Sequence, residues 1–359
     1  MERVGIGVIG CGVISAAYLT AARHFPILDV RAVADLDPAA AAARAEAFGT
    51  RAVAIDALLA DPAIEIVVNL TVPKAHRTVS LQALAAGKHV HSEKPLATSF
   101  AEGREIMAAA EARGLRVGCA PDTFLGGAQQ ACRALVDAGA IGTPVGGTAF
   151  FLNPGHERWH PAPAFYYQPG GGPVLDMGPY YLTALVNLLG PVAEVAAMVA
   201  TPRAERIVTS EPLKGRSIPV EVPTHAAATL RFVGGAVVQV SLSFDVQAHR
   251  HVPLEIYGTE GTLLPPDPNW FGGAVELHRQ GGAWETVTHD HPYTDDNYRI
   301  IGAADMAHAI REGRPHRASG GLALHVLEVM EAFGLASGSG RTVVLETRPD
   351  RPAPLEGRL

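Results

Sequence analysis

This chain of 359 residues has few cysteines and no excess of positive charge. The three cysteines, Cys11, Cys119 and Cys132, lie far apart and form no C-x-x-C pair. This pattern argues against a disulfide framework or a structural zinc site and suits a reducing compartment. Lysine and arginine number 29 against 36 acidic residues, with no basic run that would neutralise a nucleic-acid backbone. We therefore expect a cytoplasmic protein with no metal and no nucleic-acid partner.

Long apolar segments are lacking as well. The uncharged stretch at 4–22 superficially resembles a secretory or membrane segment, but four glycines between Gly5 and Gly12 interrupt it at strand and turn spacing. The charges of Glu2 and Arg3 cancel instead of forming the basic start of a signal peptide. No other stretch is long and apolar enough to span a bilayer, so we expect no membrane association.

The chain does have ample apolar material for a core, with 48% apolar and 18% charged residues, and its length predicts about two domains. Short β-branched runs alternate with alanine-rich stretches in the first third, which predicts an α/β fold with a doubly wound parallel sheet. The expected strands are 4–9, 30–34, 64–70, 89–91 and 116–119, with helices near 13–24, 38–48, 76–86 and 99–112. Pro38 behind Asp37, and Ser99 with Glu102, are typical of helix starts.

The pattern changes after about residue 121. A helix at 128–138, a strand at 147–152 and a long glycine- and proline-rich loop precede strands at 224–232, 236–244 and 254–257. This order predicts an α+β domain with a large, mostly antiparallel, open-faced sheet, closed by helices near 299–311 and 322–337. We predict domains at 1–121 and 122–347, and a tail at 348–359 that is loose or packed on a neighbour.

Glycines at the end of the first strand indicate a dinucleotide site. The stretch from Gly10 to Ser15 lies between the first strand and the first helix, where backbone amides can approach a pyrophosphate, although Ser15 replaces the usual third glycine. The alternative is an ordinary tight turn. Asp35 ends the second strand, where a carboxylate binds ribose hydroxyls and repels the extra phosphate of NADP. With no arginine beside Asp35 in the sequence, NAD is favoured over NADP.

Two further loops follow the carboxyl ends of later strands, at 69–73 and 93–95. Cofactors lie along that edge of an open parallel sheet, so the loops are expected to converge on one site, although each alone is also compatible with a surface turn. The predicted cofactor contacts are Gly10, Gly12, Val13, Ile14, Asp35, Leu36, Thr71, Val72, Pro73, His76, Glu93 and Lys94.

Polar residues at helical spacing mark a second part of the site. Asp176, Tyr180, Thr183 and Asn187 follow a run of glycines and would share one stripe of an otherwise apolar helix. Such a stripe predicts contacts with a hydroxyl-rich substrate or, alternatively, a buried network between helices. Because proline belongs in the first helical turn, Pro179 is expected to leave Asp176 at the edge of the helix or outside it.

The loop at 153–172 is rich in aromatic residues and histidine. We predict substrate contacts by His156, Trp159, His160, Tyr166 and, from the helix, Thr183. The alternatives are a loop that packs on its own aromatic rings, a subunit contact, or Trp159 covering the cofactor. The same loop contains H-E-x-x-H at 156–160, but prolines on both sides make a zinc-binding helix improbable.

Glu93-Lys94-Pro95, the glycine fingerprint at 8–15 and the glycine-rich loop before Asp176 resemble the glucose–fructose oxidoreductase, inositol dehydrogenase and MocA (Gfo/Idh/MocA) family over essentially the whole chain. The resemblance implies an NAD(P)-binding Rossmann domain and a substrate-binding domain whose open sheet forms homodimers or homotetramers. It also implies hydride transfer at a carbinol of a sugar, polyol or glycoside, with Lys94 and Asp176 at the family's catalytic lysine and helix aspartate.

Tyr180 departs from many family members, which have a histidine there, but resembles the glucose–fructose oxidoreductase and dihydrodiol dehydrogenase branches. A phenol with an ordinary pKa near 10 needs help to act as a base at neutral pH. Our hypothesis is that Tyr180 takes the hydroxyl proton, that Lys94 and the cationic nicotinamide stabilise its phenolate, and that Asp176 orients the substrate. Lys94 is also compatible with a plain ion pair to Glu93.

Two other functions remain open from the sequence. A protein that retains NAD tightly would use it for transient oxidation, as in glycoside hydrolysis or epimerisation. A non-catalytic NAD-binding sensor would keep the fold alone, although binding alone does not require both Lys94 and Asp176.

Overall fold

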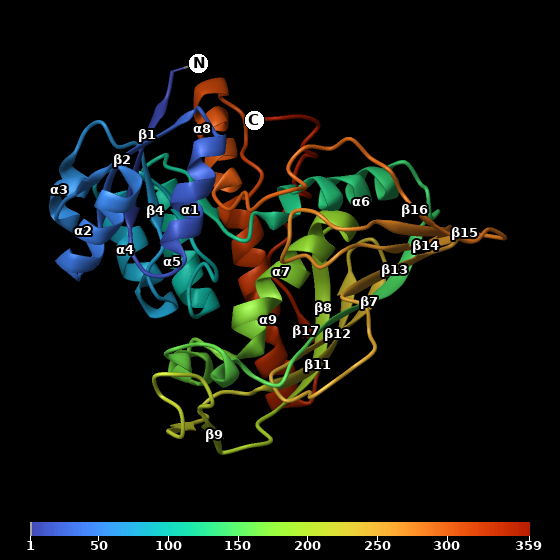
Figure 1. The fold of residues 1–359 in the computed structure, drawn as a ribbon. Coiled ribbons are helices and arrows are strands. Elements are labelled where there is room, and N and C mark those ends of the chain that lie inside the picture. Colours follow the sequence, from blue (N-terminus) through green and yellow to red (C-terminus); the bar gives the residue numbers. More distant parts are fainter. Residues whose placement is uncertain (1) are drawn as a thin grey trace.

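The computed structural model describes residues 2–359, and its N-terminal part is a six-stranded parallel sheet of order β3-β2-β1-β4-β5-β6. The strands are β1 (Val4–Ile9), β2 (Leu28–Ala34), β3 (Arg51–Ala52), β4 (Ile66–Asn69), β5 (His89–Ser92) and β6 (Val117–Cys119). The helices between them are α1 (Ser15–Ala21), α2 (Pro38–Phe48), α3 (Ile55–Ala60), α4 (Pro73–Ala85) and α5 (Phe100–Glu111). The predicted doubly wound parallel sheet is confirmed (Figure 1).

Local signals explain most of these elements. β1 and β4 are buried along their full length because helices cover both faces of the sheet. Asp37 caps α2 by accepting the Ala39 N–H, and Ser99 caps α5 by accepting the Glu102 N–H, as predicted. The two-residue strand β3 and the short helix α3 were not predicted, and the first helix is shorter than expected because a 3-10 turn (Ala22–His24) follows α1.

The second sheet has nine strands in the order β16-β15-β14-β13-β7-β12-β11-β8-β17, and only the β12–β7 pair is parallel. This confirms the predicted large, mostly antiparallel sheet. Its strands are β7 (Pro144–Leu152), β8 (Val192–Ala200), β11 (His225–Phe232), β12 (Val237–Ser243), β13 (Leu254–Gly258), β14 (Gly261–Leu264), β15 (Glu276–Arg279), β16 (Trp284–Thr286) and β17 (Val343–Val344). A separate small pair consists of β9 (Glu205–Ile207) and β10 (Ser217–Pro219).

Four α-helices follow β6 in the chain: α6 (Gly127–Asp137), α7 (Gly172–Leu189), α8 (Ile301–Glu312) and α9 (Gly320–Ser339). α7 and α9 pack against each other and against strands of the second sheet, whereas α8 contacts β4 and β6 of the first sheet. α9 also contacts α5 and β6, so this long helix lies between the two sheets (Figure 1). The proposed division at 1–121 and 122–347 therefore separates the strands, while the last two helices pack across it.

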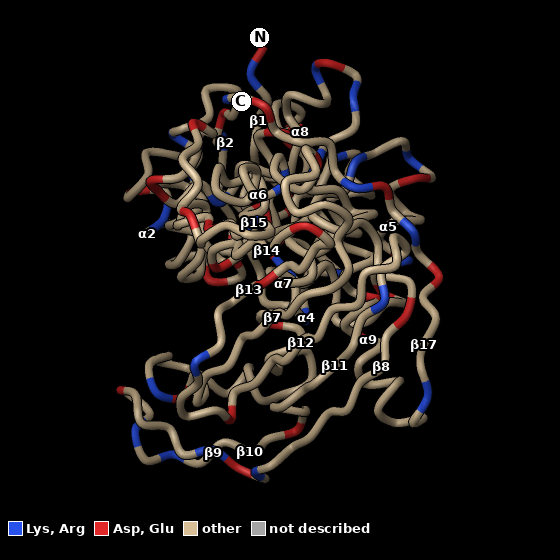
Figure 2. The backbone as a smooth tube through the Cα atoms, turned by 90° about the vertical axis from the view of Figure 1, so that its right-hand side faces the viewer, with Lys and Arg blue, Asp and Glu red and all other residues tan. Residues whose placement is uncertain are grey.

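Acidic and basic residues alternate along the backbone without a large block of one sign (Figure 2). No helix within residues 2–359 combines the length and apolar character needed to cross a membrane.

The tail at 348–359, predicted to be loose or packed on a neighbour, makes ordered contacts with α6. Leu355 is buried and its N–H donates to Oε1 of Gln130 on α6, 2.7 Å away. The carbonyl of Pro352 accepts from the guanidinium of Arg133 at 2.9 Å. The tail therefore packs on its own domain, because α6 presents buried polar side chains that require partners.

A buried aspartate fixes the start of α8. Oδ2 of Asp122 accepts the N–H groups of Ile300 and Gly302, each at 2.9 Å. Ile300 has a φ of 100°, a strained value for a β-branched residue. Burial raises the pKa of Asp122 to about 6, although the two N–H donors act to lower it.

Replacing Asp122 with asparagine is expected to change how stability depends on pH. Because the folded-state pKa of about 6 exceeds the unfolded value near 3.9, the folded protein holds the proton more tightly, and stability falls as pH rises from about 4 to about 6. In Asp122→Asn this loss, of about 3 kcal/mol, is absent. Denaturant unfolding at pH 4.5 and 7.5 captures about 2 kcal/mol of this loss, with exposed Asp350→Asn as control. An equal pH response in Asp122→Asn and the wild type would contradict the assignment.

Candidate active site

The loop after β1 approaches the neighbouring strand very closely. A Cβ atom on Gly10 would lie 2.6 Å from the backbone of Leu70, and the φ of Gly10 is 105°, so this position requires glycine. Gly12 faces open space, with no atom within 4 Å of the place that a Cβ atom would occupy. Ser15 replaces the third glycine without closing the loop, because its hydroxyl donates to the Gly12 carbonyl at 2.6 Å.

Asp35 lies at the end of β2 beside this loop. Its two carboxylate oxygens accept the N–H groups of Cys11, at 2.6 Å, and of Asp37, at 2.9 Å. Since a carboxylate has about four lone-pair sites, it can still accept ribose hydroxyls. A cavity of about 1100 Å³ adjoins it, lined among others by Gly10, Gly12, Leu36, Thr71 and Val72.

Exposed apolar side chains border the same cavity. Leu36 is 90% exposed and Val72 is 64% exposed, and Val13 in the glycine loop is 83% exposed. Such side chains provide contact surface for the base and sugar of a dinucleotide. Together with the open space at Gly12 and the carboxylate of Asp35, they fit NAD.

Arg44 lies near this site, although no arginine stands beside Asp35 in the sequence. From the second turn of α2 its guanidinium donates to the Gly12 carbonyl at 3.2 Å. Position 44 is nine residues beyond Asp35, and the helical geometry of α2 returns it to the glycine loop. The site therefore combines an acidic group, Asp35, with a basic group that can meet phosphate.

The loops after β4 and β5 are tied together by buried side chains. Oδ1 of Asn69 accepts the Thr71 hydroxyl at 2.7 Å, and the ring nitrogens of His76 lie 2.9 Å from the Thr71 carbonyl and 2.6 Å from the Pro95 carbonyl. His76 is fully buried. It therefore holds the two loops in place, and its predicted contact with the cofactor stays a prediction.

Glu93 is also committed to protein partners. Its carboxylate accepts the Tyr18 hydroxyl at 2.7 Å and the backbone N–H of Lys94 at 2.8 Å. Tyr18, on α1, was not singled out from the sequence, because its partner Glu93 lies 75 residues away. The side chain of Lys94 points elsewhere, so the alternative of a plain Lys94–Glu93 ion pair is wrong.

Lys94 reaches across to Asp176 on α7. Its ammonium group donates to Oδ1 of Asp176 at 2.8 Å and to the Asp176 carbonyl at 2.7 Å. The second carboxylate oxygen lies 3.0 Å from Nε2 of His156. Although burial acts to raise it, Lys94 and His156 hold the pKa of Asp176 well below its ordinary value. A charged pair with a neighbouring imidazole thus lies at the junction of the two domains.

The start of α7 differs from the expectation. The helix begins at Gly172 with Pro173 in its first turn, so Asp176 lies inside the helix, and Pro179 is accommodated within it. Asp176 and Tyr180 consequently share one face at i and i+4. Lys94 joins them, because its ammonium lies 5.3 Å from the centroid of the Tyr180 ring as well as on Asp176.

Tyr180 is buried between charges of both signs. Burial raises the pKa of its hydroxyl above the ordinary value, Lys94 and Arg299 act to lower it, and Glu93 acts to raise it. As predicted, Lys94 acts to lower the pKa of Tyr180. Burial raises that pKa by more, so it stays above the ordinary value. Arg299, which precedes strained Ile300, was missed because it is 119 residues from Tyr180. Its guanidinium is oriented by Asn269 and Asn297.

The aromatic loop places its predicted residues around His156. The His156 ring lies 4.4 Å from the Tyr166 ring and 5.4 Å from the Trp159 ring, measured between centroids. Trp159 is 61% exposed. Nδ1 of His160 accepts the Ala162 N–H at 3.0 Å. The H-E-x-x-H segment forms only a 3-10 turn (His156–Arg158), and no group of three or more metal-binding side chains occurs within residues 2–359.

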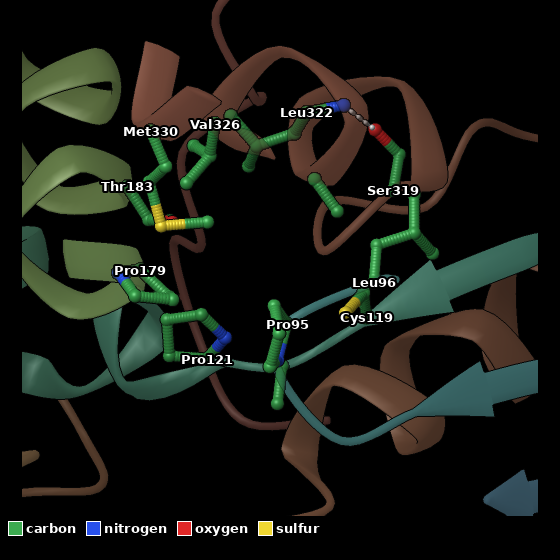
Figure 3. A pocket seen from close by; sticks show the side chains of 12 residues that line it. Pro95, Leu96, Cys119, Pro121, Pro179, Thr183, Ser319, Leu322, Val326 and Met330 are labelled. Carbon is green, nitrogen blue, oxygen red and sulfur yellow. Dashed lines mark hydrogen bonds between the residues drawn. The ribbon is translucent and has the colours of Figure 1, made fainter. Parts of the chain in front are cut away.

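Thr183 lies deeper than the other predicted substrate contacts. It lines a void of about 10 Å³ together with Pro95, Pro121 and Met330 (Figure 3). A void of this size holds at most one water molecule, so a sugar cannot reach Thr183 from this side.

A buried ion network anchors the aromatic loop. The guanidinium of Arg206 donates to Oε1 of Glu157 at 3.1 Å and to the Asp245 carboxylate, and Glu157 also accepts the Tyr167 hydroxyl. The Arg206 side chain is only 3% exposed. No local signal marks Arg206, because its partners Glu157 and Asp245 lie 49 residues before it and 39 residues after it. The network shows that the loop is built into the domain.

Two family profiles match the chain. Residues 4–120 match the family described as "Oxidoreductase family, NAD-binding Rossmann fold", and residues 129–264 match "GFO/IDH/MocA C-terminal domain".

The curated relatives are distant in sequence. The chain is 27% identical to 1,5-anhydro-D-fructose reductase of Ensifer adhaerens over 63% of its own length and 64% of that protein. It is 26% identical to levoglucosan dehydrogenase of Pseudarthrobacter phenanthrenivorans over 74% of each chain. D-Apiose dehydrogenase of Paraburkholderia graminis is 27% identical over 97% of this chain and 91% of that protein. The chain thus spans slightly less than two thirds of the first of these relatives.

Solved structures share the whole fold. A levoglucosan dehydrogenase in complex with NADH and L-sorbose aligns with a TM-score of 0.84 at 22% identity, covering 97% of this chain and 100% of that chain. An NAD-binding oxidoreductase from Klebsiella pneumoniae aligns with the same TM-score at 24% identity, covering 96% and 99%.

Proposed function

Because the chain belongs to the Gfo/Idh/MocA oxidoreductase family, with an NAD-binding Rossmann domain, we propose that it transfers hydride between NAD and a carbinol of a sugar, polyol or glycoside. The observation that carries this proposal is the Lys94–Asp176 pair, with an ammonium-to-carboxylate distance of 2.8 Å. The side chains of Lys94 and Asp176 are only 16% and 15% exposed. Burying a charged pair costs desolvation energy, and NAD binding alone does not require such a pair at the domain junction.

The chain's own residues supply binding and charge. When bound, NAD accepts or returns the hydride. Lys94 donates a hydrogen bond to the reacting oxygen and stabilises the negative charge that develops there. Tyr180, a protonated phenol because of its raised pKa, donates a second hydrogen bond to that oxygen. Asp176 fixes the direction of the Lys94 ammonium and orients the substrate.

A hydroxyl-rich substrate fits the loop that borders this pair. The rings of Trp159 and Tyr166 flank His156, which contacts Asp176. Aromatic faces can stack on the apolar face of a sugar ring. The names of the relatives, which include an anhydrosugar reductase and a levoglucosan dehydrogenase, support a sugar or anhydrosugar as substrate.

We also propose that the chain forms a homodimer or homotetramer through the open face of the nine-stranded sheet. Met198 on β8 is 79% exposed and pairs in register with Ala227 on β11. A hollow of about 520 Å³ extends over these residues and Gln239. Small and apolar side chains on a flat, unpartnered sheet face favour association with a second copy.

Cofactor choice depends on Asp35. In Asp35→Ser, kcat/KM with NAD is expected to fall about tenfold or more because two ribose hydrogen bonds are weakened. The ratio of kcat/KM with NAD to kcat/KM with NADP should also fall, because the carboxylate that repels the extra phosphate is removed while Arg44 stays beside Gly12. Steady-state rates with each cofactor measure both effects. Asp29→Ser, at the other end of β2, is the control. Unchanged rejection of NADP in Asp35→Ser would contradict this role.

The function is tested by incubating the purified protein with NAD or NADP and a panel of aldoses, inositols, anhydrosugars and glycosides while following NADH fluorescence. Sustained turnover with NAD is expected for at least one sugar. A burst of no more than one equivalent per site would instead favour retained NAD and transient oxidation. NAD binding with no reduction across the panel would favour the sensor.

A further inference from the structure

Arg299 is a partly buried cation whose hydrogen-bond partners are neutral. Its guanidinium donates to Oδ1 of Asn297 at 3.1 Å and to Oδ1 of Asn269 at 2.8 Å. In the part of the chain that the structure describes it forms no ion pair, since Glu93 attracts it only from beyond that range. The buried Arg206, by contrast, pairs with a carboxylate. Removing a guanidinium from water without a counter-ion costs free energy, so another group should benefit from the charge of Arg299.

The backbone next to Arg299 is held in one conformation. Oδ2 of Asp122 accepts the N–H groups of Ile300 and Gly302, each at 2.9 Å. Ile300, which directly follows Arg299, has a φ of 100°. Strained backbone of this kind persists only where surrounding contacts maintain it, and it clusters at functional sites. These contacts fix the point from which the Arg299 side chain extends.

The guanidinium of Arg299 faces the hydroxyl of Tyr180. It donates a hydrogen bond to that oxygen, and its charge acts to lower the pKa of the phenol. Three hydrogen bonds to Asn269 and Asn297 leave further N–H donors of the guanidinium for Tyr180. Because a guanidinium has donors only, the Tyr180 oxygen is the acceptor in this contact. The proton of the phenol is therefore directed at a different partner.

Two cations flank Tyr180, and they act on different parts of it. The ammonium of Lys94 lies 5.3 Å from the centroid of the ring and is paired with Asp176 at 2.8 Å. Arg299 contacts the phenol oxygen instead, and no carboxylate competes for it. Arg299 is thus the cation that acts on the atom of Tyr180 that carries the proton.

Building on the proposed function, we propose that Arg299 is a positioning residue for hydride transfer, whose guanidinium holds the Tyr180 oxygen so that the phenol O–H donates to the oxygen of the reacting carbinol. A phenol that accepts from a cation is a stronger donor, because consecutive hydrogen bonds polarise each other. The effect increases as negative charge develops on the reacting oxygen. Arg299 itself forms no covalent bond and transfers no proton.

The test is a double-mutant cycle of Arg299→Met and Tyr180→Phe. The substrate is the sugar, from a panel of aldoses, inositols, anhydrosugars and glycosides, that the wild type oxidises fastest with saturating NAD. With Tyr180 present, Arg299→Met is expected to lower kcat about thirtyfold, with little change in the KM for the sugar. In Tyr180→Phe the same substitution should cost less than about threefold, because the hydroxyl through which Arg299 acts is absent.

Arg216→Met, at an exposed arginine, is the matched control for this cycle. An equal loss of kcat with and without the Tyr180 hydroxyl would overturn the proposal, because a purely structural role or a direct contact with the sugar does not depend on that hydroxyl. If thermal melting shows that Arg299→Met does not fold, Arg299→Lys takes its place. Lysine keeps the charge, so we expect a smaller loss that is again confined to the protein with Tyr180.

A second measurement requires neither cofactor nor turnover. The eight tyrosines are labelled with carbon-13 at Cζ, and the signal of Tyr180 is identified by its absence in Tyr180→Phe. We expect this signal to move in Arg299→Met, because the phenol oxygen loses a charged donor, while the signal of the neighbouring Tyr181 stays in place. Arg216→Met should leave both signals unchanged. A Tyr180 signal that does not move in Arg299→Met would overturn the proposal.

The two levels of proposal fail in different ways. If the wild type reduces NAD with no sugar of the panel, the proposed function fails, and the role of Arg299 in it fails too. If the wild type turns over and Arg299→Met costs the same in both backgrounds, only the role of Arg299 fails.

Discussion

Lys94→Met is expected to lower kcat/KM for the sugar substrate by about a thousandfold or more while leaving NADH binding within about tenfold of the wild type. The ammonium donates to the Asp176 carboxylate and lies 5.3 Å from the centroid of the Tyr180 ring. Removing it takes away stabilisation of charge that develops on the reacting oxygen, an effect that appears in kcat more than in KM.

The Lys94→Met variant also tests whether Lys94 compensates the buried charge of Asp176. Without Lys94, the carboxylate of Asp176 keeps only His156 as a partner, so burial is less well compensated and its pKa should rise. Steady-state kinetics, NADH titration and thermal melting on the same preparation separate loss of chemistry from loss of folding. Lys214→Met, at an exposed lysine, is the control. A Lys94→Met enzyme with more than a tenth of wild-type kcat would contradict the role of Lys94.

Tyr180→Phe is expected to lower kcat by about a hundredfold with a small effect on KM. The phenol donates a hydrogen bond whose value increases as negative charge develops on the carbinol oxygen. Because Tyr180 is 8% exposed, the phenyl ring should fill the same space and preserve folding.

The pH profile of this variant identifies the role of the phenol. If Tyr180 is a donor, Tyr180→Phe keeps the acid-side decline of the oxidation rate, since that decline belongs to another group. If Tyr180 is the proton acceptor, as the sequence alone suggests, the same substitution removes it. The buried Tyr181→Phe, on the adjacent face of α7, is the matched control. A full-rate Tyr180→Phe enzyme would exclude both roles.

The sequence predicts the Rossmann half well because its signals are local. The adjacent residues Asp37 and Pro38 mark the start of α2. Gly10 is required where the loop after β1 passes close to the backbone of Leu70. β3 and α3 were missed because two and six residues give too short a periodicity to recognise.

The candidate site is only partly predictable, because its contacts join distant segments. Lys94, Asp176 and His156 each stand out in the sequence, but their contacts span 82 and 20 residues and depend on how the glycine-rich loop enters α7. Arg206 could not be found at all, because its partners are supplied by the folded loop. Pro179 does not limit the helix as expected, since α7 continues through it.

The most direct test of the account is to ask where the hydride goes. A substrate of the enzyme, deuterated at the reacting carbinol carbon, is oxidised with NAD, and the NADH formed is analysed by mass spectrometry. The account predicts NADH heavier by one mass unit and a carbonyl product that has lost its deuterium. NADH of unchanged mass, or a sugar product that keeps the label with no NADH released, would contradict direct transfer from carbinol to NAD as the net reaction.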